Sequence, residues 1–99
     1  MIKKITIELS DGTKYRLKRL SELQSIDRSK SALFLFDNGE IFIGRSVGEI
    51  DEDGDFDIIL QGKTYPSAFP LKKLIGWAYL KGISQGEVLI KSIKEGGKG

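Results

Sequence analysis

The sequence contains no cysteine and no histidine among its 99 residues. Their absence excludes disulfides, zinc sites built from Cys and His, thiol chemistry and any mechanism that uses imidazole as a general base. An enzyme would have to work with carboxylates, lysine or tyrosine alone, and six of the 14 carboxylates gather in one polar loop at 49–57. We therefore expect a non-catalytic protein with no cofactor and no metal site, located in the reducing cytoplasm.

Long apolar runs are also absent. The longest covers Ala32 to Phe36, far short of the ~20 residues that a membrane-spanning helix needs. Charged residues at positions 8, 11 and 14 interrupt the apolar stretch that a signal peptide requires, so we expect no membrane association. The length and the 39% hydrophobic content are typical of one globular domain, predicted over residues 1–95 with a flexible tail at 96–99.

Charge is distributed unevenly along the chain. Residues 1–30 have a balance of +4, residues 31–62 of −7 and residues 63–99 of +5, for a net charge of +2. A small domain with this pattern is expected to have an acidic pole and a basic pole, suited to steering a charged partner or to head-to-tail packing of copies. The alternative is that the acidic segment is simply a set of solvated turns.

The hydrophobic pattern is mostly that of short strands. Alternating apolar residues on both sides of Asp11-Gly12 predict an N-terminal hairpin over 1–18. The spacing then changes to three, which predicts a short helical stretch at about 19–27, with 3₁₀ character allowed. The apolar run 32–36 is typical of a strand buried on both faces. Further strands are expected at 41–44, 56–60, 65–69 and 74–79.

Near the C-terminus, Ser84 and Glu87 have the spacing of a capping box, and apolar residues follow at helical intervals. We expect a helix at 85–95 within a C-terminal segment 84–95. Short strands at intervals of about ten residues, with Gly44 and Gly76 inside strands, favour a small barrel with its core at 19–80.

Two motif matches in the acidic part of the chain do not indicate catalysis or a strong metal site. Residues 44–48 spell G-x-S-x-G, but a nucleophile elbow needs a histidine and a large parallel sheet. Residues 49–54 imitate the start of a calcium loop, yet Leu60 stands where a bidentate glutamate is needed. The six carboxylates at 49–57 therefore form either a polar turn or a weak divalent-ion site.

A third match is longer and carries a family resemblance. It consists of Leu33-x-Leu35-x-Asp37-Asn38-Gly39-x-Ile41-x-x-Gly44, followed by Asp53-x-x-Phe56-Asp57-Ile58-Ile59-Leu60. This string resembles the first conserved segment of the Sm-like family, and the short helix before it and the strands after it follow that family's order of elements. The resemblance covers about residues 19–79, with the N-terminal hairpin and the C-terminal segment as additions.

The resemblance implies a mainly β fold, namely a small, strongly bent Sm-like or SH3-like β-barrel preceded by a short helix. It also implies edge-to-edge assembly into a homo-oligomeric ring, with RNA held at the inner rim. The family's base-reading asparagine falls on Asp57, its companion loop aspartate on Asp53, and the glycine of its second segment on Gly76. Asp57 departs from the family because it is an anion, which repels phosphate.

Aromatic and basic residues supply the other candidate binding positions. Tyr65 and Tyr79 are the expected surface members of an aromatic group that lies near Lys72 and Lys73 in the sequence, whereas Trp77 and Phe69 are expected in the core. Such a group suits either stacking of nucleic-acid bases beside phosphate-binding lysines or a groove for a peptide. A second basic group, also explained as an ordinary solvated edge strand, contains Lys14, Arg16 and Lys18.

These features together predict a binding module whose leading ligand is RNA. The alternative is a protein partner, including further copies of the same chain, bound by an SH3-like interaction domain. The two differ in salt dependence, since phosphate contacts weaken steeply with salt and an apolar groove does not.

Overall fold

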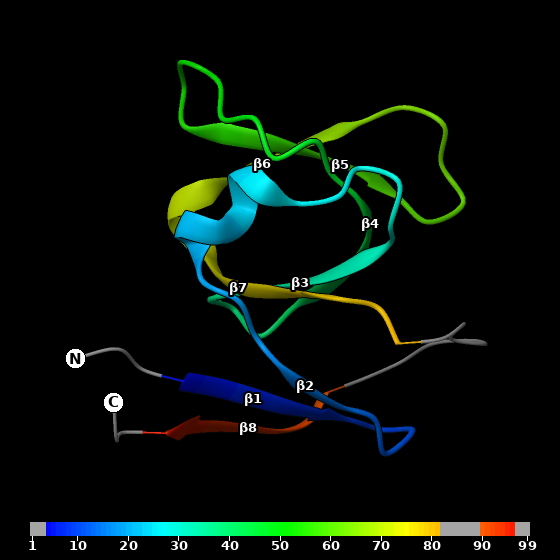
Figure 1. Cartoon of the computed structure of the whole chain (residues 1–99), viewed down its shortest axis with the longest axis vertical. Helices are drawn as coiled ribbons and strands as arrows, with labels where there is room; N and C mark the ends of the chain where they lie inside the picture. The colour runs from blue at the N-terminus through cyan, green and yellow to red at the C-terminus, as the bar shows by residue number, and fades with distance from the viewer. Residues whose placement is uncertain (1–3, 82–89, 97–99) are drawn as a thin grey trace.

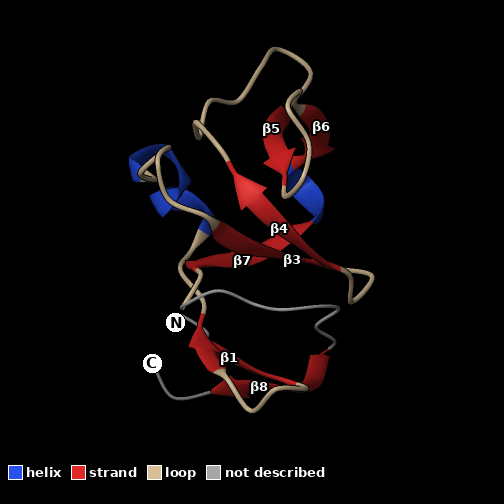
Figure 2. Ribbon diagram, turned by 90° about the vertical axis from the view of Figure 1, so that its right-hand side faces the viewer, coloured by secondary structure: helices blue, strands red, loops and turns tan. Residues whose placement is uncertain are grey.

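The computed structural model describes residues 4–81 and 90–96. The protein is mainly β, as the sequence predicts, and its strands pair antiparallel in two sheets. One sheet has three strands in the order β2-β1-β8, and the other has five in the order β6-β5-β4-β3-β7. Figure 1 shows the small sheet below the larger one, and Figure 2 shows it as a separate layer under β3 and β7.

The small sheet joins the two ends of the chain. β1 (Lys4–Leu9) pairs with β2 (Lys14–Arg16) through the hairpin predicted from the sequence, and on its other side with β8 (Ile90–Gly96). The hairpin turn needs a glycine, because Gly12 has a φ of +88°. Ile7, Leu9 and Tyr15 all face inward from this sheet and are buried.

The larger sheet is built around β3 (Ala32–Phe36), with β4 (Ile41–Arg45) on one side and β7 (Leu74–Tyr79) on the other. β5 (Asp55–Leu60) and β6 (Ser67–Pro70) extend it beyond β4. All five residues of β3 are buried, which confirms the prediction of a strand covered on both faces.

Alternate residues of β3 belong to two different cores. Ala32, Phe34 and Phe36 pack with Trp77, Phe56 and other residues inside the curve of the larger sheet. Leu33 and Leu35 point the other way and pack against the inner face of the small sheet. The small sheet is thus the second cover of β3, and its inner face is apolar for that reason.

The larger sheet curls strongly, but it is not a closed barrel (Figure 1). Its edge strands are β6 and β7, and no ladder joins them among the described residues. Pro70 ends β6 without an N–H to donate, and the 3₁₀ helix η2 (Leu71–Lys73) leads directly into β7. This corrects the expectation of a small β-barrel over residues 19–80.

The expected C-terminal helix is corrected, whereas the stretch predicted at 19–27 contains a short helix of the 3₁₀ type that the spacing allowed. This is η1 (Leu20–Ser25), and the stretch has no α-helix. Within 85–95, residues 90–95 belong to strand β8, while 84–89 lie outside the described residues. The C-terminal strand forms because β1 offers it an edge with six register pairs, a long-range contact that outweighs local helix signals. In the described part of the chain, no helix has the length and apolar character to cross a membrane.

Gly76 is required where the segment after β2 crosses β7. A Cβ at this position would lie 2.8 Å from Leu17 Cβ and 3.0 Å from the Lys18 carbonyl oxygen. That close approach lets the Lys18 N–H donate to the Trp77 carbonyl (2.6 Å) and the Trp77 N–H donate to the Lys18 carbonyl (3.2 Å).

We predict that Gly76→Ala lowers the free energy of unfolding by about 1–3 kcal/mol, the usual cost of overpacking. It should also speed hydrogen exchange at the Trp77 amide. Gly39→Ala is the matched control, because a Cβ there meets nothing within 4 Å and only the positive φ of +85° is strained. Urea denaturation and amide exchange measure both effects, and equal Trp77 exchange in the two variants would contradict the packing argument.

Candidate nucleic-acid interface

The two basic parts of the sequence meet in the small sheet, because β1 pairs with both β2 and β8. The acidic segment lies in the loop between β4 and β5 and in β5 itself, at the opposite end of the molecule in Figure 1. The uneven charge along the chain therefore becomes a separation of charge in space.

The outer face of the small sheet is polar and mostly basic. Because Ile7 and Tyr15 are buried, their neighbours in β1 and β2 point outward. Register places Thr6 between Arg16 and Lys94, and Glu8 between Lys14 and Ser92. We call this surface the basic face, made of Thr6, Glu8, Lys14, Arg16, Ser92 and Lys94 together with Lys91. A hollow of about 100 Å³ lies among Thr6, Glu8, Lys14, Ser92 and Lys94.

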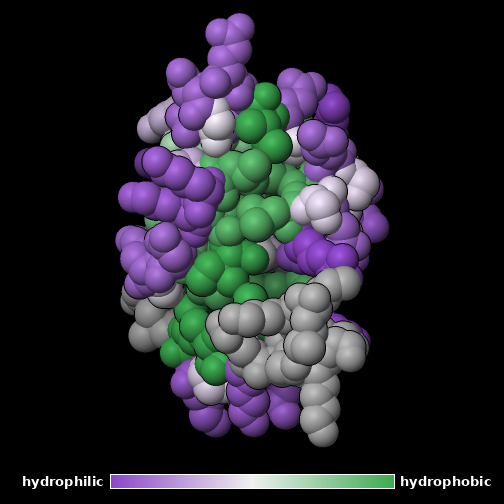
Figure 3. All heavy atoms as spheres, turned by 90° about the vertical axis from the view of Figure 1, so that its left-hand side faces the viewer, coloured by the Kyte–Doolittle hydropathy of each residue, from purple (hydrophilic) through white to green (hydrophobic). Residues whose placement is uncertain are grey.

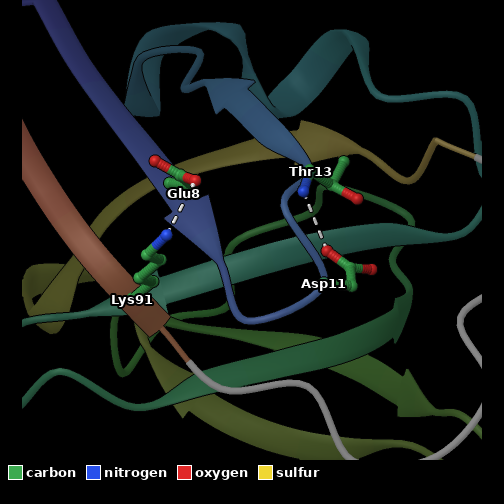
Figure 4. A network of polar contacts seen from close by, with 4 residues as sticks. All are labelled: Glu8, Asp11, Thr13 and Lys91. Atoms are coloured by element: carbon green, nitrogen blue, oxygen red, sulfur yellow. Dashed lines mark hydrogen bonds and ion pairs between the residues drawn. The ribbon is translucent and has the colours of Figure 1, made fainter.

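The single carboxylate of the basic face is paired. The register of β8 passes from Ser92 opposite Glu8 to Ile90 opposite Leu9, so Lys91 is the inserted residue of a β-bulge. Figure 4 shows the Lys91 ammonium group reaching across to Glu8, with Nζ 3.6 Å from Oε2. The Lys91 side chain remains 65% exposed and that of Glu8 26% exposed. The ion pair offsets one negative charge and leaves Lys14, Arg16 and Lys94 as exposed cations.

The turn that connects β1 to β2 is held by its own polar side chains (Figure 4). The Thr13 backbone N–H donates to Asp11 Oδ1 at 2.9 Å. Hydrogen bonds from the Thr13 side chain and then from this N–H lower the pKa of the Asp11 carboxyl below its ordinary value. The turn thus fixes the hairpin that carries Lys14 and Arg16.

A second basic group surrounds the Tyr79 ring, which packs against the core inside the curl of the larger sheet. Lys18 Nζ lies 5.9 Å from the ring centroids of both Trp77 and Tyr79, and Lys30 Nζ lies 5.3 Å from that of Tyr79. These are cation–π distances. The Tyr79 hydroxyl accepts the Asp27 N–H at 2.9 Å, and its ring meets the Trp77 ring edge-on. The Trp77 ring is buried, and the half-buried Tyr79 ring already faces both lysines.

Lys81 links the Tyr79 group to the basic face. Its Nζ donates to the Lys14 carbonyl at 2.6 Å and lies 5.1 Å from the centroid of the Tyr15 ring. Its backbone N–H donates to the Tyr15 hydroxyl at 2.9 Å. Among the predicted positions, Lys14 and Arg16 lie on the basic face, while Lys18 lies beside Tyr79, whose ring packs against the core of the curled sheet.

The other predicted positions lie elsewhere. Lys72 and Lys73 are exposed on η2, at the far end of β7 from Tyr79 and about 20 Å from it along the strand. Gly76 is buried under the Leu17–Lys18 segment and presents no surface.

Three predicted positions belong to the end of the molecule that is remote from the small sheet. Asp57 is exposed on β5 and lines a hollow of about 140 Å³ with Glu49, Asp51, Asp55, Val47 and Ile50. Asp53 does not line it. Instead, the Asp53 and Asp55 N–H groups donate to Asp51 Oδ1, which is the arrangement of a polar turn. Tyr65 is 60% exposed in the loop between β5 and β6.

The serine of the G-x-S-x-G match has a structural role. Ser46 is 3% exposed, and its Oγ accepts the Gly48 N–H at 3.1 Å. Gly48 has a φ of +75° and lies against the Leu23 carbonyl, where a Cβ would collide at 2.3 Å. The motif thus forms a tight turn over η1.

Sequence reasoning missed four lysines of this region. Lys91 and Lys94 fall within the helix that the sequence predicts at 85–95. The apolar–polar alternation of Ile90 and Ser92 is the local signal that could have indicated a strand there. Lys30 reaches Tyr79 through the long-range pairing of β3 with β7, and Lys81 reaches Tyr15 where the end of β7 meets the small sheet. The sequence has no local signal for either contact. Comparison with protein-family models, curated proteins and solved structures finds no match to this chain.

The Asp11 turn gives a pH-dependent prediction. Its folded pKa is depressed, so its contribution to stability is present above the unfolded value of about 3.9 and is lost as pH falls through the folded pKa. Thr13→Val removes the hydroxyl and should raise the Asp11 pKa toward its ordinary value. Carboxyl NMR titration measures the shift, and denaturation at pH 7 and pH 3 should show a smaller acid loss in the variant. An unchanged Asp11 pKa would contradict the assigned cause.

Proposed function

We propose that this protein is a non-catalytic RNA-binding module whose contact surface is the basic face, extended by Lys18, Lys30 and Lys81. The observation that carries the proposal is the separation of charge. The basic ends of the chain share one sheet, and the acidic segment lies at the other end of the molecule.

Phosphate chemistry supports this surface. Exposed Lys and Arg side chains release counterions when they meet nucleic-acid phosphates, and hydroxyls such as those of Thr6 and Ser92 add hydrogen bonds. The acidic loop at the far end repels the same ligand. A polyanion is therefore steered toward the small sheet before contact.

The order of elements supports an Sm-like relationship for residues 19–79. A short 3₁₀ helix precedes five antiparallel strands, and the larger sheet is strongly curled with η2 across the gap between its edges. A ring of copies would require the free edges of β6 and β7. Both backbone groups of Trp77 are already bonded to Lys18, which weighs against using that edge and favours binding by a single chain.

Charge reversal tests the location of the surface. K14E/R16E and K72E/K73E each change the net charge from +2 to −2, so they form a matched pair. We expect K14E/R16E to weaken RNA binding roughly tenfold or more at low salt. The magnitude of the slope of log K against the logarithm of salt concentration should fall by about two, because two phosphate contacts are lost. K72E/K73E should keep most of the affinity and the full slope.

Fluorescence anisotropy with labelled RNA at several salt concentrations measures both quantities, and circular dichroism checks that each variant is folded. If K72E/K73E abolishes binding and K14E/R16E does not, the interface belongs to η2 and the basic face is the wrong surface. If neither wild type nor variants bind RNA, the proposed function is wrong.

A gain of affinity gives a separate prediction that loss of folding cannot imitate. Glu8→Gln removes the carboxylate of the basic face and releases Lys91 from its ion pair. RNA binding should strengthen by roughly threefold at low salt, an effect that screening reduces at high salt. Glu52→Gln is the matched control, because it makes the same change of charge on the exposed acidic loop. Equal effects of the two substitutions would indicate net charge alone.

A protein partner is the second candidate, favoured by an apolar strip on another face. Figure 3 shows this strip running between hydrophilic borders on the side where η1 and η2 lie in Figure 1. Exposed Leu20 belongs to η1 and half-buried Leu71 to η2. A complex formed there would be insensitive to K14E/R16E and would change little with salt.

A further inference from the structure

We infer that the RNA bound by the basic face is a base-paired duplex, held through its phosphates and 2′-hydroxyls rather than by stacking of its bases. This inference rests on the proposed function and names the form of nucleic acid that the same surface fits. Three observations carry it: the absence of an available aromatic ring on the described basic face, the two separated rows of cations, and the Thr6 hydroxyl between them.

The described part of the basic face offers no aromatic surface on which a base can stack. Tyr15 points inward and is 2% exposed, and Trp77 is 1% exposed. The Tyr79 ring is half-buried and already faces two lysine ammonium groups and the Trp77 edge. Proteins that bind single strands without sequence preference depend on base–aromatic stacking, which contributes about 1–3 kcal/mol per base.

The exposed aromatic ring of Tyr65 does not supply the missing platform. It lies in the β5–β6 loop, which follows the Leu60 end of β5 and belongs to the half of the molecule away from the small sheet. A single strand held by the basic face would have to reach across the larger sheet to stack on it.

The cations of the basic face form two rows. Lys14 and Arg16 lie on β2, Lys91 and Lys94 lie on β8, and β1 separates the two strands. Neighbouring strands are about 4.8 Å apart, so the backbones that carry the rows are about 10 Å apart. Two rows of phosphates bordering a groove match this arrangement. A single strand offers only one row.

The strand between the rows carries a hydroxyl toward the ligand. Thr6 lies on β1 between Arg16 and Lys94, and Ser92 lies beside it opposite Glu8. The wide, shallow minor groove of duplex RNA displays 2′-hydroxyls, which donate and accept hydrogen bonds. Duplex DNA lacks these groups. The central Thr6 hydroxyl, with that of Ser92 on the β8 row, therefore favours duplex RNA over duplex DNA.

The experiment compares three labelled probes with the full chain by fluorescence anisotropy: a 20-base-pair RNA duplex, one of its strands made from an unstructured sequence, and the corresponding DNA duplex. We expect the RNA duplex to bind at least tenfold more tightly than the single strand and several-fold more tightly than DNA. K94E removes a cation of the β8 row and should weaken duplex binding more than single-strand binding. Thr6→Val, which keeps the side-chain shape, should reduce the preference for RNA over DNA.

The possible failures are distinguishable. If the single strand binds as tightly as the duplex, the inference is overturned while RNA binding stands. If duplex DNA binds as tightly as duplex RNA and Thr6→Val changes neither, the role of the 2′-hydroxyls is overturned. If no probe binds, both this inference and the proposed function fail.

Discussion

The burial of β3 on both faces is the constraint from which the rest of the architecture follows. Its five apolar side chains alternate between two cores, so the strand needs a cover on each side. Full burial of a large apolar side chain contributes about 1.5–3 kcal/mol to the free energy of folding. Exposure of both Leu33 and Leu35 to water would lose that contribution twice. The curled sheet encloses one face of β3, and the small sheet must enclose the other.

The need to cover β3 on its second face also determines which charged residues of the small sheet face outward. The small sheet presents Ile7, Leu9 and Tyr15 to Leu33 and Leu35, which leaves every second position of β1, β2 and β8 facing outward. Because β1 binds β2 and β8 together, the outward positions draw on both basic parts of the chain. The acidic segment follows β4 to the far end of the larger sheet. The polarity of the molecule is thus a consequence of strand pairing.

Local patterns predicted the elements that depend on local chemistry, and failed where a distant strand decided the outcome. Alternation around Asp11-Gly12 identified the first hairpin, and the run 32–36 identified β3. The helix expected at 85–95 is wrong over β8, because the β1 residues that pair with β8 are 81 to 92 positions away in the sequence. Because a helix was expected there, the sequence did not place Lys94 beside Thr6 on the basic face. Lys14 and Arg16 were found because their outward orientation follows from alternation with Tyr15.

The candidate interface lies largely outside the region of family resemblance. Residues 19–79 form the curled sheet, whereas the basic face belongs to the hairpin and to β8, which are additions to it. The crossing at Gly76 ties the two parts together, because Lys18 bonds to Trp77 on the outer edge of β7. That contact occupies the edge needed for ring assembly and at the same time orders Lys18 beside Tyr79. In this chain, therefore, the segment added before residue 19 occupies part of the β7 edge and also carries Lys14 and Arg16 of the proposed interface.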